Sequence, residues 1–231
     1  MTLLHASGIK AGYGPTRIVD DVSLRIESGE IVCLLGRNGM GKTTLLKSVL
    51  GLIKRVEGSV HIAERNVDDW PAHRIARLGV GYGPQERGIF HELTVEDNLR
   101  LCMSRGVNRK AIASVLDTFP VLSGKLGQRA GSLSGGEQKM LVLAEAILGS
   151  PRLIVLDEVV EGVQPSVVNR FIEVIRKVNE RSGAAFLIVE QNIGFALKLA
   201  SRFLVMSGGR IVDEGQTGEA TRAAVERHFI L

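Results

Sequence analysis

The stretch that most restricts how this chain can fold is Gly36-Arg-Asn-Gly-Met-Gly-Lys-Thr43, which fits the pattern G-x-x-x-x-G-K-[ST]. The apolar run Ile31–Leu35 precedes it, and a segment with the composition of a helix, residues 43–50, follows it. Glycines at these positions let successive backbone N–H groups curve around phosphate oxygens, and the N-terminus of a helix adds a partial positive charge. The pattern therefore predicts a nucleotide phosphate-binding loop between a buried strand and a helix.

Several residues of this loop are candidate contacts of a nucleotide. Lys42 is long enough to reach the β- and γ-phosphates, and the hydroxyl of Thr43 is suited to Mg²⁺. The full set of candidate contacts in the loop is Gly36, Arg37, Asn38, Gly39, Met40, Gly41, Lys42, Thr43 and Thr44. A glycine-rich turn without a ligand is the alternative, and the strand before the loop and the helix after it argue against that alternative.

Composition places the chain among ordinary folded proteins. Of its 231 residues, 45% are hydrophobic and 23% are charged, which excludes a disordered, collagen-like or disulfide-scaffold chain. No apolar run approaches the roughly 18 to 20 residues that cross a bilayer. The first residues also lack the basic segment and apolar core of a secretory signal. We expect a chain that neither spans a membrane nor is exported by that route.

Charge and cysteine content say less about function. The net charge of +4 is a small excess over 231 residues, and no block of five like charges occurs, so we expect no nucleic-acid partner. Cys33 and Cys102 form no CxxC pair. We interpret both as reduced packing thiols of a cytosolic protein.

The order of predicted elements indicates an α/β fold. Apolar strands alternate with helices before residue 85 and after residue 151, which is typical of a parallel sheet covered on both faces. Residues 86–150 have helical spacing and no good strand, which predicts a helical insertion. The predicted strands are 9–12, 23–26, 31–35, 58–63, 79–82, 153–156, 185–189, 203–206 and 210–212. The predicted helices are 41–50, 71–77, 108–118 (stopped by Pro120), 167–178, 193–200 and 220–227, with two more that start near 94 and 136.

Two acids, Asp157 and Glu158, follow the fully apolar run 153–156. Ligands of open α/β sheets bind at the carboxyl edge of the strands, where these acids should lie. Asp157 is suited to hold Mg²⁺ directly or through water, and Glu158 is suited to orient or deprotonate an attacking water. Acids that merely end a strand in solvent are the alternative, which the phosphate loop in the same sheet makes weaker.

The segment Leu133-Ser-Gly-Gly-Glu-Gln138 lies between the phosphate loop and the acidic pair, and it resembles the signature of the ATP-binding cassette (ABC) ATPases. The segment would begin a second helix, and at the N-terminus of that helix Ser134 and the amides of Gly135 and Gly136 can hold a phosphate. An ordinary capped helix start has the same appearance, and the two interpretations do not compete.

The resemblance covers nearly the whole chain and implies a single ABC ATPase domain over residues 1–231. Its P-loop NTPase core has a mainly parallel sheet, with an N-terminal antiparallel β subdomain and an inserted α-helical subdomain. Residues 1–85 and 151–231 would form the nucleotide-binding core with the β subdomain. Residues 86–150 would form the helical signature subdomain.

Further residues match the family in its order. Tyr13 resembles the early aromatic that stacks on adenine, and Gln85 resembles the Q-loop glutamine that senses Mg²⁺ and the γ-phosphate. Residues 161–164 occupy the place of the D-loop, which crosses the dimer interface. The implied catalytic residues are Lys42, Gln85, Glu158 and Gln191, and the implied metal ligands are Thr43, Gln85 and Asp157.

The sequence departs from the family pattern at two places. Val159 and Val160 follow the acidic pair where proline is common, which removes no functional group. Gln191 stands where the switch histidine is expected. A glutamine can hydrogen-bond a γ-phosphate, but it cannot carry a positive charge or shuttle a proton.

The family implies ATP and Mg²⁺ as cofactors and a head-to-tail dimer with a second ABC ATPase subunit, identical or paralogous. Each ATP would lie between the phosphate loop of one subunit and residues 134–136 of the other, and closure and opening would supply the power stroke. Transmembrane permease subunits would be the other partners. They would hold this cytoplasmic chain at the inner face of the cell membrane.

Several stretches look like the second ATPase of branched-chain (hydrophobic) amino acid importers. They are residues 84–90, 93–96, 161–162, 189–192 and 209–215. The same stretches also resemble ATPases of urea and short-amide importers and, more distantly, of a lipopolysaccharide exporter. Residues 86–105 would face the permease, and Phe90, Leu93 and Leu99 are candidates for a groove that takes a permease helix, with ordinary core as an equal alternative.

Two other classes of function stay open on the sequence. One is a nucleic-acid-associated ABC-type ATPase, but such proteins usually carry a long coiled coil between loop and signature, or two cassettes in one chain. The other is a nucleotide-binding subunit that does not hydrolyse ATP, for which Gln191 is the only support.

Overall fold

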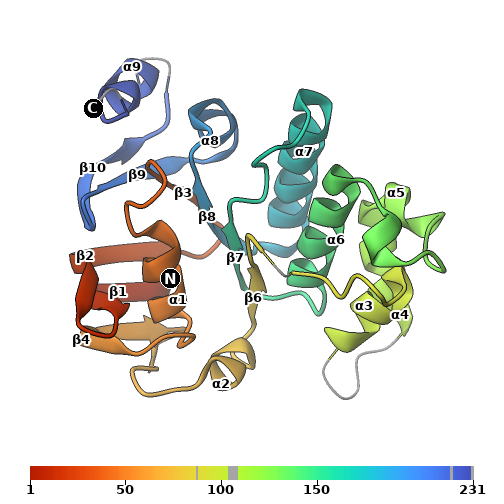
Figure 1. Ribbon diagram of the computed structural model, residues 1–231, viewed down its shortest axis with the longest axis horizontal. Coiled ribbons are helices and arrows are strands. Elements are labelled where there is room, and N and C mark those ends of the chain that lie inside the picture. The colour runs from red at the N-terminus through yellow and green to blue at the C-terminus, as the bar shows by residue number, and fades with distance from the viewer. Residues whose placement is uncertain (87, 104–108, 219–220, 230–231) are drawn as a thin grey trace.

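Two β-sheets and a group of helices make up the computed structural model, which describes residues 1–86, 88–103, 109–218 and 221–229. The first sheet is antiparallel, and the second lies between it and most of the helices (Figure 1). The expected α/β fold, with an antiparallel N-terminal part and a mainly parallel sheet, is confirmed. The N-terminal strands and the helical segment lie at opposite ends of the molecule.

The first sheet has the strand order β2-β1-β4-β5. Its strands are β1 (Thr2–Tyr13), β2 (Thr16–Glu27), β4 (Arg55–Ile62) and β5 (Arg65–Asn66). The hairpin of β1 and β2 is much longer than the predicted strands 9–12 and 23–26. The reason lies in Gly8 and Asp21, which have positive φ angles of 59° and 56° near shifts of register. Such bulges interrupt the alternation of apolar and polar residues from which a strand is predicted.

The second sheet has the order β10-β9-β3-β8-β7-β6, in which only β10 runs antiparallel to its neighbour. Its strands are β3 (Ile31–Leu35), β6 (Val80–Gly83), β7 (Leu153–Asp157), β8 (Ala185–Glu190), β9 (Arg202–Ser207) and β10 (Arg210–Gln216). Every residue of β3, β7 and β8 is buried. Strands buried on both faces read as continuous apolar runs, which is why these three were predicted well.

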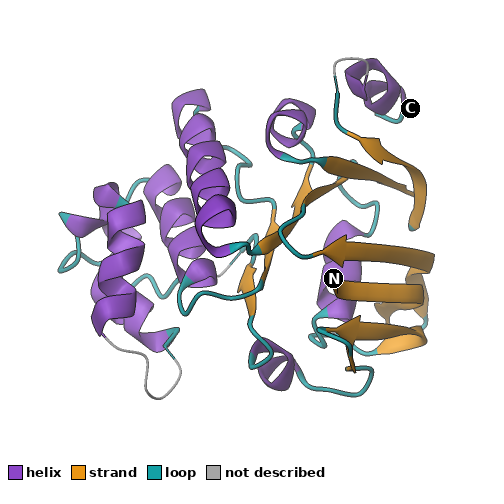
Figure 2. Cartoon of the chain, turned by 180° about the vertical axis from the view of Figure 1, so that it is seen from behind, coloured by secondary structure: helices purple, strands orange, loops and turns teal. Residues whose placement is uncertain are grey.

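The described helices are interspersed with the strands along the chain. They are α1 (Lys42–Val49), α2 (Ala72–Ala76), α3 (Val95–Leu101), α4 (Arg109–Thr118), α5 (Pro120–Ser123), α6 (Gly135–Ile147), α7 (Pro165–Ser182), α8 (Ile193–Leu199) and α9 (Thr221–Arg227). A 3₁₀ turn, Ala130–Ser132, precedes α6. Figure 2 shows the helices α3 to α6 gathered on the side away from the antiparallel sheet. The predicted helix starts at 108 and 220 lie outside the described residues.

The second sheet separates two hydrophobic cores. Ile31, Cys33 and Leu35 of β3 pack into the core formed with α3 to α8. Val32 and Leu34 of the same strand pack into the core that α1 and the antiparallel sheet form. Successive side chains of a strand point to opposite faces, so one five-residue strand supports both layers. This central position holds the loop that follows β3.

The structure corrects or narrows the prediction at three residues of the segment between β6 and β7. Pro120 ends one helix as expected, but it also begins α5 as its first residue, a position that proline favours. Leu99 is fully buried against the helical core, so of the two roles predicted for it, permease groove and ordinary core, the structure supports the core. Cys102 is exposed at the end of α3, so it is not the packing thiol we expected.

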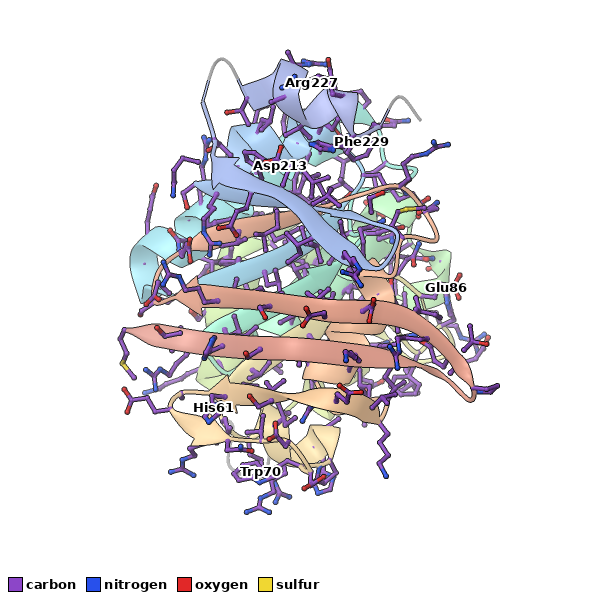
Figure 3. The ribbon with its side chains drawn as sticks, turned by 90° about the vertical axis from the view of Figure 1, so that its left-hand side faces the viewer. His61, Trp70, Glu86, Asp213, Arg227 and Phe229 are labelled. Carbon is purple, nitrogen blue, oxygen red and sulfur yellow. The ribbon has the colours of Figure 1, made fainter. Side chains whose placement is uncertain are left out.

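The antiparallel sheet turns one face outward. Figure 3 looks onto that face, with His61 on β4 and, above the sheet, α9 close to β10. The ring of His228 lies 3.1 Å from the carboxylate of Asp213 and attaches the end of α9 to β10. Within the residues that the structure describes, no helix has the length and apolar character needed to cross a membrane.

Candidate functional site

The loop after β3 has a shape that only glycine allows at several points. A Cβ on Gly36 would lie 2.5 Å from the carbonyl oxygen of Met206 on β9, far inside van der Waals contact. Gly39 and Gly41 have φ angles of 80° and 98°, a region that side chains disfavour. The loop therefore turns sharply beneath the sheet edge, and α1 starts immediately after it with Lys42.

Lys42 closes this loop from the inside. Its Nζ donates to the carbonyl oxygens of Gly36 at 2.8 Å and Arg37 at 2.9 Å, and it lies 3.2 Å from Oε1 of Glu158. The side chains of Lys42 and Glu158 are only 3% and 4% exposed. A buried ammonium is thus held where the phosphates of a nucleotide are expected, with a carboxylate as its counter-ion.

Thr43 and Asp157 meet beside the loop. The Thr43 hydroxyl donates to Oδ1 of Asp157 at 3.1 Å. The other oxygen, Oδ2, is buried and has no hydrogen-bond partner. Burial, together with the nearby Glu158 carboxylate, raises the pKa of Asp157 to about 6 against the lowering effect of the Thr43 hydroxyl. An orphaned carboxylate oxygen beside a hydroxyl is a donor set that suits a hard cation such as Mg²⁺.

Glu158 and Gln85 are joined directly, although the sequence places them far apart. Nε2 of Gln85 donates to Oε2 of Glu158 at 2.6 Å and to Oε2 of Glu161 at 3.0 Å. Glu158 has a φ angle of 48°, and its N–H donates to the carbonyl of Val189 at 2.9 Å. The end of β6 and the end of β7 are therefore linked through their functional side chains.

A cavity of about 330 Å³ connects these groups. It is lined by Ile18, Asn38, Gly39, Gly41, Lys42, Thr43, Thr44, Gln85 and Glu158. Most of the predicted loop residues thus share one space with the acid Glu158 and with Gln85. Gly36, Arg37, Met40 and Asp157 do not line it, and the sulfur of Met40 instead accepts from the N–H of Gly208.

The predicted adenine-stacking residue does not line this cavity. Tyr13 ends β1 and is 48% exposed, and Ile18 on the paired strand β2 reaches the cavity wall near Gly41. Sequence reasoning missed Ile18 because a single apolar residue on a strand carries no chemical pattern. Its place five residues after Tyr13, on the same hairpin, was the only available signal.

The signature segment lies apart from the cavity in this single chain. Ser134 is the N-cap of α6, where its Oγ accepts from the N–H of Glu137 at 3.4 Å and Glu137 Oε2 accepts from the N–H of Ser134 at 3.1 Å. Gly135 is exposed, and an added Cβ would have no atom within 4 Å. None of residues 134–136 lines the cavity.

The turn after β8 holds the last predicted residue. Gln191 is half-buried directly after β8 and does not line the cavity. Its neighbour Glu190, which sequence reasoning missed, is buried and accepts from the N–H of Val160 at 3.0 Å. Burial raises the pKa of Glu190 to about 7. This hydrogen bond joins the end of β8 to the turn that follows the acidic pair.

A family model described as ABC transporter matches residues 19–161, which is more than half of the chain. The chain belongs to the ABC transporter family. BraG of Pseudomonas aeruginosa, a high-affinity branched-chain amino acid transport ATP-binding protein, is 36% identical over 91% of each chain. LptB of Escherichia coli K12, a lipopolysaccharide export system ATP-binding protein, is also 36% identical, over 95% of this ABC cassette and 92% of LptB.

Solved structures support the same assignment. The ADP conformation of MJ1267, an ATP-binding cassette of an ABC transporter, superposes with a TM-score of 0.87 at 25% identity, over 100% of this cassette and 99% of MJ1267. The chain is therefore an ATP-binding subunit of an ABC transporter, and ATP hydrolysis is the general activity of such cassettes. They associate with the membrane through permease subunits and work as dimers. The equal identity to BraG and LptB leaves the transported substrate open.

Proposed function

We propose that this cassette hydrolyses Mg-ATP at a site shared with a second ABC ATPase subunit and powers import of branched-chain or other hydrophobic amino acids. The observation that carries the catalytic part is the meeting of Lys42, Gln85 and Glu158 in one cavity at the phosphate loop. It brings a phosphate-binding cation and a carboxylate together. Three separate segments of sequence supply these groups.

The phosphate loop would bind the nucleotide and place the metal. Lys42 reaches the β- and γ-phosphates once it leaves its own loop carbonyls, and the residues after it supply backbone N–H groups at the start of α1. Thr43, Asp157 and Gln85 would hold Mg²⁺, which when bound neutralises charge on the β- and γ-phosphates. The orphaned Oδ2 of Asp157 supports this donor set.

Glu158 would then act on water. It accepts a proton from the attacking water as the water oxygen bonds to the γ-phosphorus and the bond to the β–γ bridging oxygen breaks. The products are ADP and phosphate. Gln85 orients the carboxylate through its hydrogen bond, and Gln191 would donate to the γ-phosphate. The presence of Lys42 and Glu158 argues against a subunit that only binds nucleotide.

The exposed Gly135 supports a site split between two cassettes. Its backbone does not need glycine, because its φ is not positive and a Cβ would meet nothing within this chain. No contact of the described chain requires glycine at this position, so we attribute it to a contact outside the chain. A nucleotide held by the partner's phosphate loop and resting on residues 134–136 supplies that reason.

The helical segment would face the permease. We propose that residues 1–85 and 151–231 form the nucleotide-binding core and that residues 86–150 form the signature subdomain. Phe90 is 62% exposed, and an apolar hollow of about 240 Å³ lies between the end of α1, α2 and β6. These apolar surfaces fit a permease helix at the inner face of the membrane. Leu93 is half-buried and Leu99 fully buried, so Phe90 is the candidate that stays.

Amino-acid import is favoured over lipopolysaccharide export by the stretches of sequence that resemble the importers and by BraG. LptB, at the same identity, supports the export alternative. ATPases of urea and short-amide importers form a further alternative, whereas no observation favours a nucleic-acid partner.

Turnover of Mg-ATP by the purified full chain tests the catalytic part. K42A and E158Q should each lower turnover by about 100-fold or more, and E180Q, an exposed glutamate of α7 changed in the same way, should not. Unchanged turnover in either of the first two variants contradicts the mechanism.

Uptake of radiolabelled leucine in cells that lack this gene tests the substrate. We expect uptake to fall and to return with the wild-type gene but not with E158Q. Normal leucine uptake together with an altered outer surface would support lipopolysaccharide export instead.

A further inference from the structure

Lys139 has no role in the site described so far, yet it contacts two of its residues. It lies on the first turns of α6, five positions after the N-cap Ser134, and is half-buried. Its Nζ donates to the carbonyl oxygen of Gln85 at 3.2 Å and to that of Glu158 at 3.1 Å. One ammonium therefore holds the backbones of both residues.

These contacts complete a closed ring of interactions. The side chains of Gln85 and Glu158 are already joined at 2.6 Å on the cavity side. Lys139 joins the same two residues through their backbones. Charge-assisted hydrogen bonds are stronger than neutral ones, so the ring fixes how far the amide and the carboxylate extend into the cavity.

The backbone of Glu158 needs such support. Its φ angle of 48° is unfavourable for a residue with a side chain and persists only where neighbours hold it. The N–H is held by the carbonyl of Val189, and the carbonyl is held by Lys139. The direction in which the carboxylate points depends on both contacts.

Lys139 also acts on a buried carboxyl, that of Glu190. Glu190 is the buried last residue of β8, and the ammonium of Lys139 acts to lower the pKa of that carboxyl against the larger effect of burial.

We propose that Lys139 is a positioning residue for ATP hydrolysis, which holds Gln85 and Glu158 in the geometry that the attack of water needs and ties them to the signature helix α6. The inference rests on the proposed role of Glu158. Lys139 itself touches neither the cavity nor the phosphate loop.

The first experiment compares steady-state turnover of the full chain with K139M and K139R. K139M should lower kcat about tenfold or more, because small displacements of catalytic groups have effects of this size, and KM for ATP should stay within about twofold. K139R, which keeps the charge and the donors, should recover most of kcat. K177M, a half-buried lysine of α7, is the matched control and should behave as the wild type.

Two results of this comparison would overturn the proposal. One is wild-type kcat in K139M. The other is a joint fall of kcat, ATP affinity and melting temperature in K139M that K139R does not recover, which marks a purely structural lysine.

A double-mutant cycle with E158Q separates this proposal from the proposed function. If Lys139 acts through Glu158, K139M should lower kcat little further in the E158Q background, whereas independent effects would multiply and contradict the proposal. Wild-type turnover in E158Q alone would instead overturn the proposed role of Glu158.

Discussion

The Thr43 hydroxyl donates a hydrogen bond of 3.1 Å to Oδ1 of Asp157, across 114 positions of sequence. This contact joins the start of α1 to the end of β7 and leaves Oδ2 of Asp157 buried without a partner. A carboxylate in this state is poorly solvated, which is why its pKa is raised to about 6. The same oxygen therefore costs stability when the carboxyl is ionised, and it is the strongest candidate for a metal contact.

Replacing Asp157 by asparagine should separate the cost of burying this carboxylate from its role in binding the metal. The folded-state pKa lies above the ordinary value of 3.8, so the stability that the protonated carboxyl contributes is present below about pH 3.8 and is lost as the pH rises through about 6. Ionisation of Asp157 lowers the free energy of unfolding by about 3 kcal/mol at pH 8, and without Mg²⁺ D157N should recover part of this loss. Thermal melting with EDTA and with Mg-ATP checks this, because the variant should gain stability in EDTA and lose the stabilisation by Mg²⁺. A variant that Mg-ATP stabilises as strongly as the wild type would contradict the metal assignment.

Lys42 and Glu158 form a buried ion pair, and breaking one side of it should destabilise the fold. K42M should lower the free energy of unfolding by about 3 kcal/mol, because Glu158 then stays buried without its counter-ion. The double variant K42M/E158Q removes both charges and should recover much of that loss. Chemical denaturation checks the stabilities, and binding of a fluorescent ATP analogue should stay lost in both variants. Equal stability of the single and double variants would show that the pair is not energetically coupled.

Much of this fold follows from local patterns. The strands β3, β7 and β8 are continuous apolar runs because they are buried on both faces, and such runs are easy to recognise. The hairpin of β1 and β2 was predicted too short because bulges at Gly8 and Asp21 break its alternation. A leucine at position 99 is equally compatible with a hydrophobic core and with a partner surface, so only the tertiary structure decides between these two roles.

The residues of the candidate site likewise fall into those that a local sequence pattern predicts and those that it does not. The phosphate loop and the acids Asp157 and Glu158 could be predicted because each is a short pattern at the end of a strand. Ile18, Lys139 and Glu190 could not, because each is a single residue that reaches the site only through tertiary packing. From the sequence alone, Lys139 would be interpreted as a solvent-exposed residue of an amphipathic helix.

Gly135 offers a test of the split site that does not depend on fold stability. G135A adds a methyl group that meets no atom within 4 Å, and the φ angle of Gly135 is not positive, so alanine fits this backbone. The variant should melt at the wild-type temperature, yet turnover of ATP should fall about tenfold or more because the methyl group blocks the approach of the partner's nucleotide. G127A, another glycine with open space around it, should change neither property. Full turnover in G135A would argue against contact between this segment and a nucleotide.

Glu190 should make the stability of the chain depend on pH near neutrality. Its folded-state pKa of about 7 lies above the ordinary value of 4.5, so the carboxyl favours its protonated form in the fold. Its contribution to stability is present in full below about pH 4.5 and is lost as the pH rises through 7, by about 3 kcal/mol in all. E190Q keeps an oxygen that can accept from Val160 and carries no charge, so its stability should fall less than that of the wild type between pH 5 and 8. Urea denaturation at several pH values measures this slope, with E180Q as a control that should retain it. An unchanged slope in E190Q would mean that Glu190 is ionised in the fold at little cost, which would leave Lys139 as its effective counter-ion.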